Sequence, residues 1–306
     1  MAKARGYTKN LLVLPFDHRG SFQEKMFGVH GTPTPDQTKL ISSYKTMIFE
    51  GFEKALAGGL PKDQMGILVD EQFGAEVIAR TKKLGVTLCV PAEKSGQEEF
   101  DFEHGKHFAE AIDKVDPNFV KVLVRYNPEG DEAMNHRQAA RLAELGNFLA
   151  KTNRYYMFEL LVPATAEQLK RSQGDKGVYD REFRPRLMIQ AIQELQKAGV
   201  EPDVWKIEGL DRKEDFDKVA EATRAGGRDQ VACIVLGRGE NEEKVKHWLS
   251  VGAQVKGVVG FAVGRTVFWE PLMGFKEKKY SREEAISRVA RNYTELCQLW
   301  MREKAR

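Results

Sequence analysis

The chain is poor in cysteine and has no long apolar run. Its three cysteines, Cys89, Cys233 and Cys297, are widely spaced and form no CxxC pair. This odd set argues against a disulfide framework and a zinc site, and it fits reduced thiols in a cytoplasm. The first apolar stretch, residues 11–16, is too short for a signal sequence or a membrane span. We therefore expect a cytoplasmic protein that does not contact a membrane.

A strong excess of one charge is also missing. The 48 Lys and Arg residues are interspersed with 45 Asp and Glu residues, for a net charge of +3. A nucleic-acid-binding surface would need clustered basic residues, so we expect no such partner. Histidines are scattered; His104 and His107 share a helix face, but no third ligand stands at metal-site spacing with them. The sequence predicts neither a metal nor a cofactor. It is compatible with a homo-oligomer.

Short β-rich apolar runs alternate with longer stretches of helical period along the chain. Hydrophobic residues make up 42% and charged residues 30%, enough for a sizeable core and a solvated surface. Between the runs lie amphipathic stretches such as residues 132–151 and 181–198. The predicted strands are residues 11–16, 66–70, 86–90, 119–126, 155–162, 204–208, 231–236 and 257–263.

Eight such units match a closed parallel barrel better than an open doubly wound sheet, because a closed barrel has no sheet edges. No change of composition marks a linker. We therefore predict an α/β protein, a (β/α)8 TIM barrel, as one domain over residues 1–306. An open α/β sheet or a two-domain arrangement is the alternative. Residues 18–34 are predicted to cover one mouth of the barrel or to form a solvated loop, and residues 281–306 to form the final barrel helix.

Charged residues stand at or near the carboxyl ends of several predicted strands, where a buried strand should be apolar. An isolated charge inside a barrel is costly unless it is paired. The carboxyl ends of the strands also form the face at which barrel enzymes carry out their chemistry. The residues are Asp17, Asp70, Glu71, Lys121, Glu159, Lys206 and Glu208.

Two lysines and several carboxylates on neighbouring strands suit iminium chemistry. One lysine must be deprotonated to attack a carbonyl carbon, and a nearby cation lowers its pKa. A carboxyl group must then move protons, and Glu159 stands on the strand before Lys206. The alternative is a set of structural ion pairs, such as Lys121 with Glu159 or Lys206 with Glu208. Buried ion pairs contribute little net stability, which favours a functional role for the set.

The last two predicted strands end in glycine and arginine. Gly237-Arg238-Gly239 follows the seventh strand, and Gly264-Arg265-Thr266 follows the eighth. Glycine lets backbone N–H groups approach an anion, and arginine adds a charge-assisted bond. Loops after the seventh and eighth strands are the usual phosphate site of barrel enzymes. We predict a phosphate site formed by Arg265, Gly264, Gly237 and Gly239, although a glycine after a strand often marks only a turn.

A series of short motifs, in order along nearly the whole chain, resembles the class I (Schiff-base) aldolase superfamily. The resemblance is to tagatose-bisphosphate and sulfofructose-phosphate aldolases, and closest to the aldolase-like domain behind the kinase of some bacterial 5-dehydro-2-deoxygluconokinases. Two positions depart from the tagatose-bisphosphate pattern: His18 replaces a glutamine, and Leu236-Gly237 replaces a serine-containing turn. The motifs are "PFDHRGSF", "ILVDEQFG", "VPAEKSG", "VKVLVRYNPEG", "YMFELLVPAT", "WKIEG" and "FAVGRTVFWEPL".

The resemblance implies a metal-independent aldolase with Lys206 as the Schiff-base lysine and Glu159 as the acid and base. It further implies Lys121 as the accessory lysine, Asp17 as the group that holds a substrate hydroxyl, and Arg265 as the phosphate ligand. The implied substrate is 2-deoxy-5-keto-gluconate 6-phosphate, cleaved to dihydroxyacetone phosphate and malonate semialdehyde. Alternatives are a tagatose-bisphosphate or sulfofructose-phosphate aldolase and a non-catalytic barrel that binds a sugar phosphate. Asp70, Arg125 and Glu208 are further candidate substrate-binding residues.

Overall fold

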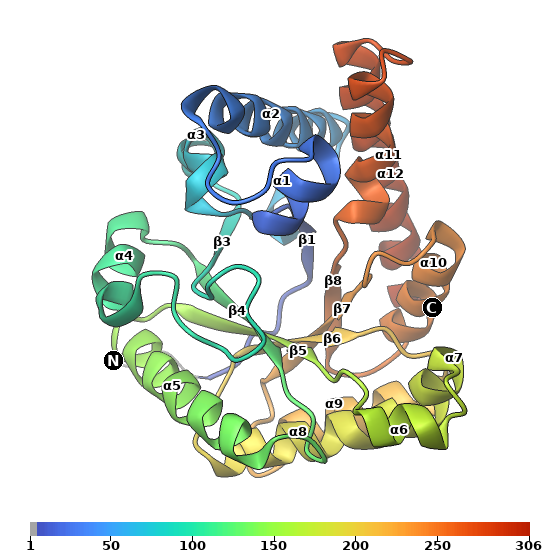
Figure 1. Ribbon diagram of the computed structural model, residues 1–306. Helices are drawn as coiled ribbons and strands as arrows, with labels where there is room; N and C mark the ends of the chain where they lie inside the picture. The colour runs from blue at the N-terminus through green and yellow to red at the C-terminus, as the bar shows by residue number, and fades with distance from the viewer. Residues whose placement is uncertain (1–4) are drawn as a thin grey trace.

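The computed structural model describes residues 5–306 and shows a closed barrel of eight parallel strands surrounded by helices (Figure 1). The strands pair in sequence order, and β1 closes the barrel by pairing with β8. The predicted (β/α)8 TIM barrel is confirmed, and each of the eight predicted strands overlaps one of those observed. The strands are β1 (Leu11–Pro15), β2 (Met65–Leu68), β3 (Thr87–Pro91), β4 (Phe119–Arg125), β5 (Tyr155–Leu161), β6 (Val204–Glu208), β7 (Ala232–Leu236) and β8 (Val258–Ala262).

Most of the helices cover the outside of the barrel, and they follow one another in chain order. No helix within residues 5–306 combines the length and the apolar character needed to cross a membrane. The α-helices are α1 (Gly20–Phe27), α2 (Pro35–Ala57), α3 (Glu71–Leu84), α4 (Phe108–Val115), α5 (Glu132–Lys151), α6 (Ala166–Arg171), α7 (Lys176–Val178), α8 (Arg184–Lys197), α9 (Lys213–Arg224), α10 (Glu242–Ala253), α11 (Arg265–Lys276) and α12 (Arg282–Lys304). Short 3₁₀ turns, Lys62–Gln64 and Gly105–His107, precede β2 and α4, and a π-helical segment, Tyr179–Phe183, precedes α8.

Two apolar clusters fill the structure. The larger one lies between the strands and the helices and includes Trp205 and Trp300. The smaller one fills the barrel interior, with Phe119, Met157 and Val204 among its members. Since side chains alternate along a strand, the residue two positions beyond each of these three also points inward. Those next positions carry the charges described below, so the apolar filling stops before the carboxyl ends of the strands.

Two glycines permit close approach where the barrel closes. A β-carbon on Gly260 of β8 would lie 1.8 Å from the Leu11 carbonyl oxygen of β1. One on Gly264 would lie 2.0 Å from the Pro15 carbonyl oxygen. Neither contact is sterically allowed, so both positions need glycine for the last strand to pack against the first. Gly264, predicted to bind phosphate, therefore has a packing role in the structure.

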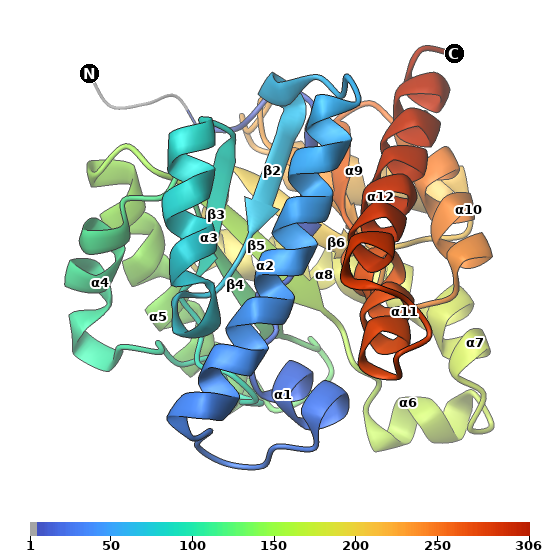
Figure 2. The ribbon, with the colours of Figure 1, turned by 90° about the horizontal axis from the view of Figure 1, so that it is seen from above.

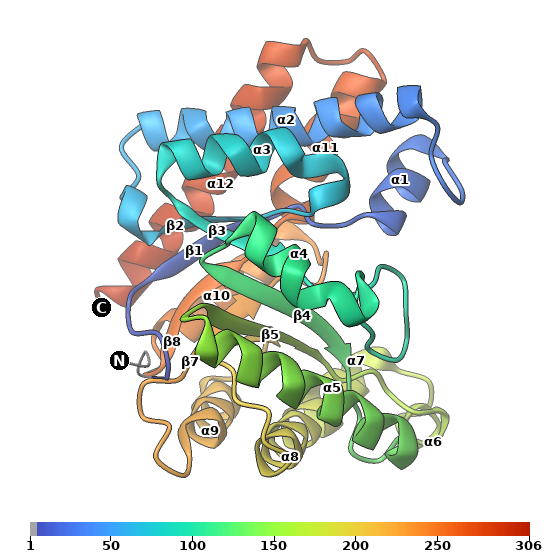
Figure 3. The ribbon, with the colours of Figure 1, turned by 90° about the vertical axis from the view of Figure 1, so that its left-hand side faces the viewer.

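Three short helices lie at the end of the barrel where the strands have their carboxyl ends. The helices α1, α6 and α7 lie there (Figure 3). The C-terminal end of α12 lies at the opposite end (Figure 2). The segment predicted to cover one barrel mouth contains α1, which lies at the end where the charged residues are.

Helix boundaries differ from prediction in two places. The predicted helix 181–198 is observed as α8, with the π-helical segment before it. Pro185 lacks the N–H that would bond to the carbonyl of Arg181, which accounts for the wider turn there. The helix directly after β8 is α11, and the predicted final barrel helix is the next one, α12. Its predicted apolar stripe is buried: Ile286, Val289, Tyr293, Leu296 and Trp300.

Candidate active site

Charged side chains form a compact cluster inside the carboxyl end of the barrel. Lys121 of β4, Glu159 of β5 and Lys206 of β6 each stand two residues beyond an apolar interior residue. Asp17 and Glu93 come from the segments that follow β1 and β3. All five are at most 7% exposed. The barrel geometry thus brings together four residues predicted from the sequence and one that was not.

Lys121 lies at the centre of this cluster. Its Nζ is 2.9 Å from Asp17 Oδ2, 2.7 Å from Glu93 Oε1 and 2.9 Å from Glu159 Oε2. Burial alone would lower the pKa of the Lys121 ammonium, but the three carboxylates raise it well above its ordinary value. Lys121 is therefore a cation near neutral pH.

Lys206 and Glu159 are paired directly. They are register partners on adjacent strands, and Lys206 Nζ lies 2.8 Å from Glu159 Oε2. The same oxygen also binds Lys121, so one carboxylate oxygen joins the two ammonium groups. The ion pair considered from the sequence between Lys206 and Glu208 is replaced by this Lys206–Glu159 pair.

The carboxyl groups of the cluster differ in their affinity for protons. Burial would raise the pKa of Glu159, but Lys121 and Lys206 lower it overall. Burial likewise opposes the effect of Lys121 on Asp17, whose pKa is lowered well below its usual range. In Glu93 burial prevails over Lys121, and the pKa is raised. Among the three, Glu93 is therefore the group that most readily takes up a proton.

Glu93 also has an unused oxygen. Its Oε2 is buried and has no hydrogen-bond partner among residues 5–306. The backbone carbonyl of Glu93 accepts a hydrogen bond of 2.6 Å from Arg19 Nη2, and Arg19 Nη1 donates to Glu103. Arg19 thereby holds the segment after β3 against the one after β1.

Two adjoining cavities open at this end of the barrel. The first, of about 190 Å³, is lined by the cluster together with Arg125 and residues 94–97. Arg125 Nη1 donates to the Gln97 carbonyl at 2.7 Å. The second, of about 460 Å³, lies between α1 and the first turns of α10 and α11. His18 and Ser21 line both cavities. A ligand bound at Lys206 could therefore extend from one cavity into the other.

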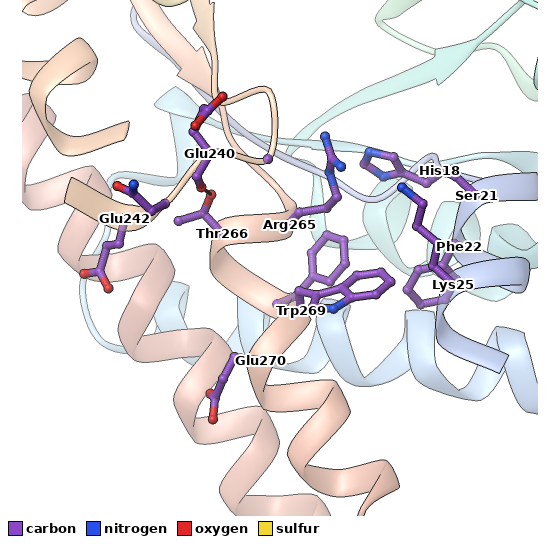
Figure 4. Close-up of a pocket in the computed structure, with 13 residues that line it drawn as sticks. His18, Ser21, Phe22, Lys25, Glu240, Glu242, Arg265, Thr266, Trp269 and Glu270 are labelled. Carbon is purple, nitrogen blue, oxygen red and sulfur yellow. Dashed lines mark hydrogen bonds between the residues drawn. The ribbon is translucent and has the colours of Figure 1, made fainter. Parts of the chain in front are cut away.

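The larger cavity has a basic corner. The side-chain nitrogens of Arg265, His18 and Lys25 point into the same space (Figure 4). Two helix N-termini, at Glu242 of α10 and Arg265 of α11, contribute residues to its wall. Cations and helix N-termini favour an anion. This corner is the candidate anion site.

His18 lies between the two cavities. Its ring packs edge-on against Phe268, and its Nδ1 is buried with no partner among the described residues. Burial lowers the pKa of His18 to about 4, with Asp17 opposing and Arg265 adding to the effect. The imidazole is therefore neutral near pH 7 and can donate through one nitrogen and accept through the other.

The glycines predicted to bind phosphate occupy different environments. Gly239 lines the larger cavity with φ at +78°, and a β-carbon there would lie 2.4 Å from the guanidinium carbon of Arg265. Gly237 packs against Val263, where a β-carbon would lie at 3.2 Å from Cγ1. Gly264 caps α11 without lining either cavity. Of the predicted glycines, Gly239 is the one positioned beside Arg265.

Asp70 and Glu208 lie apart from both cavities. Asp70 Oδ2 accepts from the Phe73 N–H at the start of α3, and Oδ1 pairs with the fully buried Lys45. Glu208 Oε2 accepts from the Val162 N–H at 3.0 Å, and Oε1 lies 3.1 Å from Arg184 Nη1. Both carboxylates are bound by the protein itself. The structure thus gives these two predicted substrate ligands structural partners instead.

Comparison with known proteins identifies the family of the chain and structures that share its fold. A family model described as "Uncharacterized protein conserved in bacteria (DUF2090)" matches residues 1–304. The chain belongs to the DUF2090 family. No curated protein matches the sequence.

Among the solved structures that share the TIM-barrel fold of this DUF2090 protein, three illustrate the low sequence identity. One is fructose-bisphosphate aldolase of Plasmodium falciparum, in complex with TRAP and a small-molecule inhibitor: TM-score 0.67, 14% identity, 97% of this chain and 92% of that one. Another is Cgl0159 of Corynebacterium glutamicum, with a TM-score of 0.56 and 18% identity over 92% of this chain and 85% of that one. A third is fructose-bisphosphate aldolase of Slackia heliotrinireducens, with a TM-score of 0.52 and 15% identity over 92% of this chain and 86% of that one.

Three residues that line the candidate site of this DUF2090 protein were not among those predicted from the sequence. Glu93 follows the predicted third strand by three residues, and extending that strand's alternation would have placed its side chain inward. His18 is next to Asp17, a predicted site residue, but its sequence context favours a scattered, solvated histidine and marks it otherwise only as a departure from the tagatose-bisphosphate pattern. Lys25 lies in a segment expected to cover the barrel mouth, and nothing in its local sequence distinguishes it from a surface lysine.

Proposed function

We propose that this protein is a class I aldolase that acts on a phosphorylated keto sugar or keto sugar acid through a Schiff base on Lys206. The observation that carries the proposal is the shared oxygen of Glu159, 2.8 Å from Lys206 Nζ and 2.9 Å from Lys121 Nζ. Within this buried cluster Lys206 would be the nucleophile, Glu159 the proton carrier and Lys121 the fixed cation.

The first steps form the Schiff base. Lys206 Nζ passes a proton to Glu159 and attacks the ketone carbon, so that a C–N bond forms and the carbonyl electron pair moves to oxygen. That oxygen takes up a proton from the attacking nitrogen, which gives the neutral carbinolamine. Glu159 then returns its proton to the hydroxyl group, which leaves as water while the nitrogen lone pair forms the C=N bond of the iminium ion. The ammonium group of Lys121 stabilises the oxygen while it carries charge.

Cleavage follows from the electron demand of the iminium ion. A hydroxyl on the carbon beyond the breaking bond loses its proton to a carboxylate, and the C–C bond breaks. The aldehyde product leaves, and the bonding electron pair moves to the iminium nitrogen as an enamine. Asp17, joined to Glu159 through Lys121, would hold that hydroxyl. Protonation of the enamine and hydrolysis of the imine return Lys206.

The basic corner of the larger cavity would hold the phosphate. Arg265 supplies a guanidinium fork and Lys25 a second cation from α1. The sequence resemblance favours 2-deoxy-5-keto-gluconate 6-phosphate, with dihydroxyacetone phosphate and malonate semialdehyde as products. A tagatose-bisphosphate or sulfofructose-phosphate substrate would use the same lysine and the same anion site.

Borohydride trapping tests the proposal. The protein is incubated with dihydroxyacetone phosphate, reduced with borohydride and digested, and the peptides are mapped by mass spectrometry. We expect an adduct on Lys206 and none on Lys45, a buried lysine outside both cavities. Absence of an adduct from Lys206 with dihydroxyacetone phosphate and with the candidate sugar phosphates would refute the iminium mechanism. Binding without any adduct would favour a barrel that binds sugar phosphate without cleaving it.

A further inference from the structure

Arg238 combines an unusual backbone with an extensively paired side chain. It follows β7, and its φ is +53°, in the left-handed region that arginine rarely adopts. Gly239 after it is also left-handed, with φ at +78°. A non-glycine residue persists in this conformation when surrounding contacts hold it there. Those contacts come from both its side chain and its main chain.

Three carboxylates surround the Arg238 side chain. Nη1 donates to Asp180 Oδ2 of the π-helical segment at 2.9 Å, and Nε lies 3.5 Å from Glu208 Oε1 at the end of β6. Nη2 lies 3.8 Å from Glu240 Oε1. Arg184 Nη1 binds Asp180 at 2.9 Å and Glu208 at 3.1 Å, so two of these carboxylates are themselves fixed.

The main chain of Arg238 holds the candidate anion-binding group. Its carbonyl oxygen accepts a hydrogen bond of 2.6 Å from Arg265 Nη2. The Arg265 guanidinium lies directly over Gly239, where a β-carbon would come within 2.4 to 2.7 Å of its carbon and both terminal nitrogens. Within residues 5–306, this is the one hydrogen bond recorded for the Arg265 side chain. Its remaining donors are left for a ligand.

We propose that Arg238 is a positioning residue that fixes Arg265 relative to the strand carrying Lys206. Glu208, two residues after Lys206 on β6, holds the Arg238 side chain, and the Arg238 carbonyl holds Arg265. The connection sets the separation between the nucleophile and the anion site. It selects ketones whose phosphate lies at one particular distance from the carbonyl carbon. This role rests on the proposed function only in taking Arg265 as the phosphate ligand.

The variant R238G tests the role directly. Glycine accepts the left-handed backbone and keeps the carbonyl, so only the paired side chain is lost. We expect inorganic phosphate to bind roughly tenfold more weakly by titration calorimetry, because Arg265 loses its fixed support. The matched control is K278G, since Lys278 is also left-handed, with φ at +60°, and lies after α11 away from both cavities. It should bind phosphate like the wild type.

A double-mutant cycle separates positioning from a general structural effect. If Arg238 acts through Arg265, R238G/R265A should bind phosphate as R265A does. In steady-state kinetics R238G should raise KM for a phosphorylated ketose and leave trapping of dihydroxyacetone on Lys206 unchanged. The variant R238K, which keeps a charge near Asp180 and Glu208, should recover part of the phosphate affinity.

Unchanged phosphate binding in R238G, or an equal loss in the R265A background, would overturn the role of Arg238. So would failure of the wild-type protein to bind phosphate. If phosphate binds and R238G weakens it, but no Lys206 adduct forms, the proposed aldolase function fails and the role of Arg238 stands.

Discussion

Glu159 and Lys206 face each other as register partners on β5 and β6, with Oε2 and Nζ 2.8 Å apart. The pairing is a direct result of barrel geometry, because side chains at matched positions of neighbouring parallel strands point inward together. Lys121 binds the same oxygen from the other side, on β4. The first two predictions concern this arrangement.

Replacing the nucleophile should abolish cleavage. In K206M the side chain keeps its length and apolar part but has no amine, and Glu159 keeps Lys121 as a partner. We expect aldol cleavage to fall by more than about 10³-fold, with no borohydride adduct. Circular dichroism should show an intact fold. The control K94M removes a lysine that lines the same cavity on a loop and should keep most of its activity. Full activity in K206M would place the nucleophile elsewhere.

Glu159 should be required for proton transfer. We expect E159Q to lower kcat by about 10²- to 10⁴-fold, since the amide cannot carry the proton between Lys206 and the carbinolamine. Single-turnover trapping should show slower adduct formation. The variant E93Q provides the comparison, because Glu93 also contacts Lys121 but not Lys206. A greater loss in E93Q than in E159Q would assign the acid and base role to Glu93.

Asp17 should make stability sensitive to acid. Its pKa is lowered in the folded protein from an ordinary value of 3.8, so the ionised form favours the folded state. This contribution is complete above 3.8 and is lost as the pH falls further towards the folded-state pKa. The gap in unfolding free energy between wild type and D17N should therefore be constant from about pH 7 to about pH 5 and narrow below. Urea unfolding across this range measures it, with D229N, an exposed site, as control.

Asp70 should matter for stability and not for substrate binding. It pairs with fully buried Lys45, which also donates to the His18 carbonyl at 3.1 Å. Removing one member leaves a buried charge without its partner, so we expect D70N to lower the unfolding free energy by about 3–5 kcal/mol. Asparagine still caps α3, and D131N, at the exposed cap of α5, controls for the cap itself. A raised KM in D70N at unchanged stability would restore Asp70 to the binding site.

The elements that could be predicted are those set by local pattern. Eight apolar runs with β-branched residues gave eight strands, and the amphipathic stretch 132–151 is observed as α5. The wider turn before α8 could not be predicted in the same way. It depends on Pro185 within an otherwise helical sequence. The spacing of apolar residues is unchanged by the loss of one backbone N–H, so it gives no sign of the wider turn.

The candidate site residues also differ in how far local sequence pattern could predict them. Lys121, Glu159 and Lys206 could be found because each interrupts an apolar strand. Asp70 interrupts a strand end just as they do, yet its partner Lys45 is on α2, and no sequence pattern connects the two. Chain position suggests where a side chain lies, but pairing across elements decides whether it faces a ligand or another residue.

The closure of the barrel also bears on how the chain folds. Leu11 of β1 pairs with Gly260 of β8, so one edge of the first strand has no partner until nearly the whole polypeptide has been made. An unpaired strand edge is prone to pair with other chains. The slowest and most aggregation-sensitive stage of folding should therefore be the docking of β8, which joins the most distant parts of the sequence.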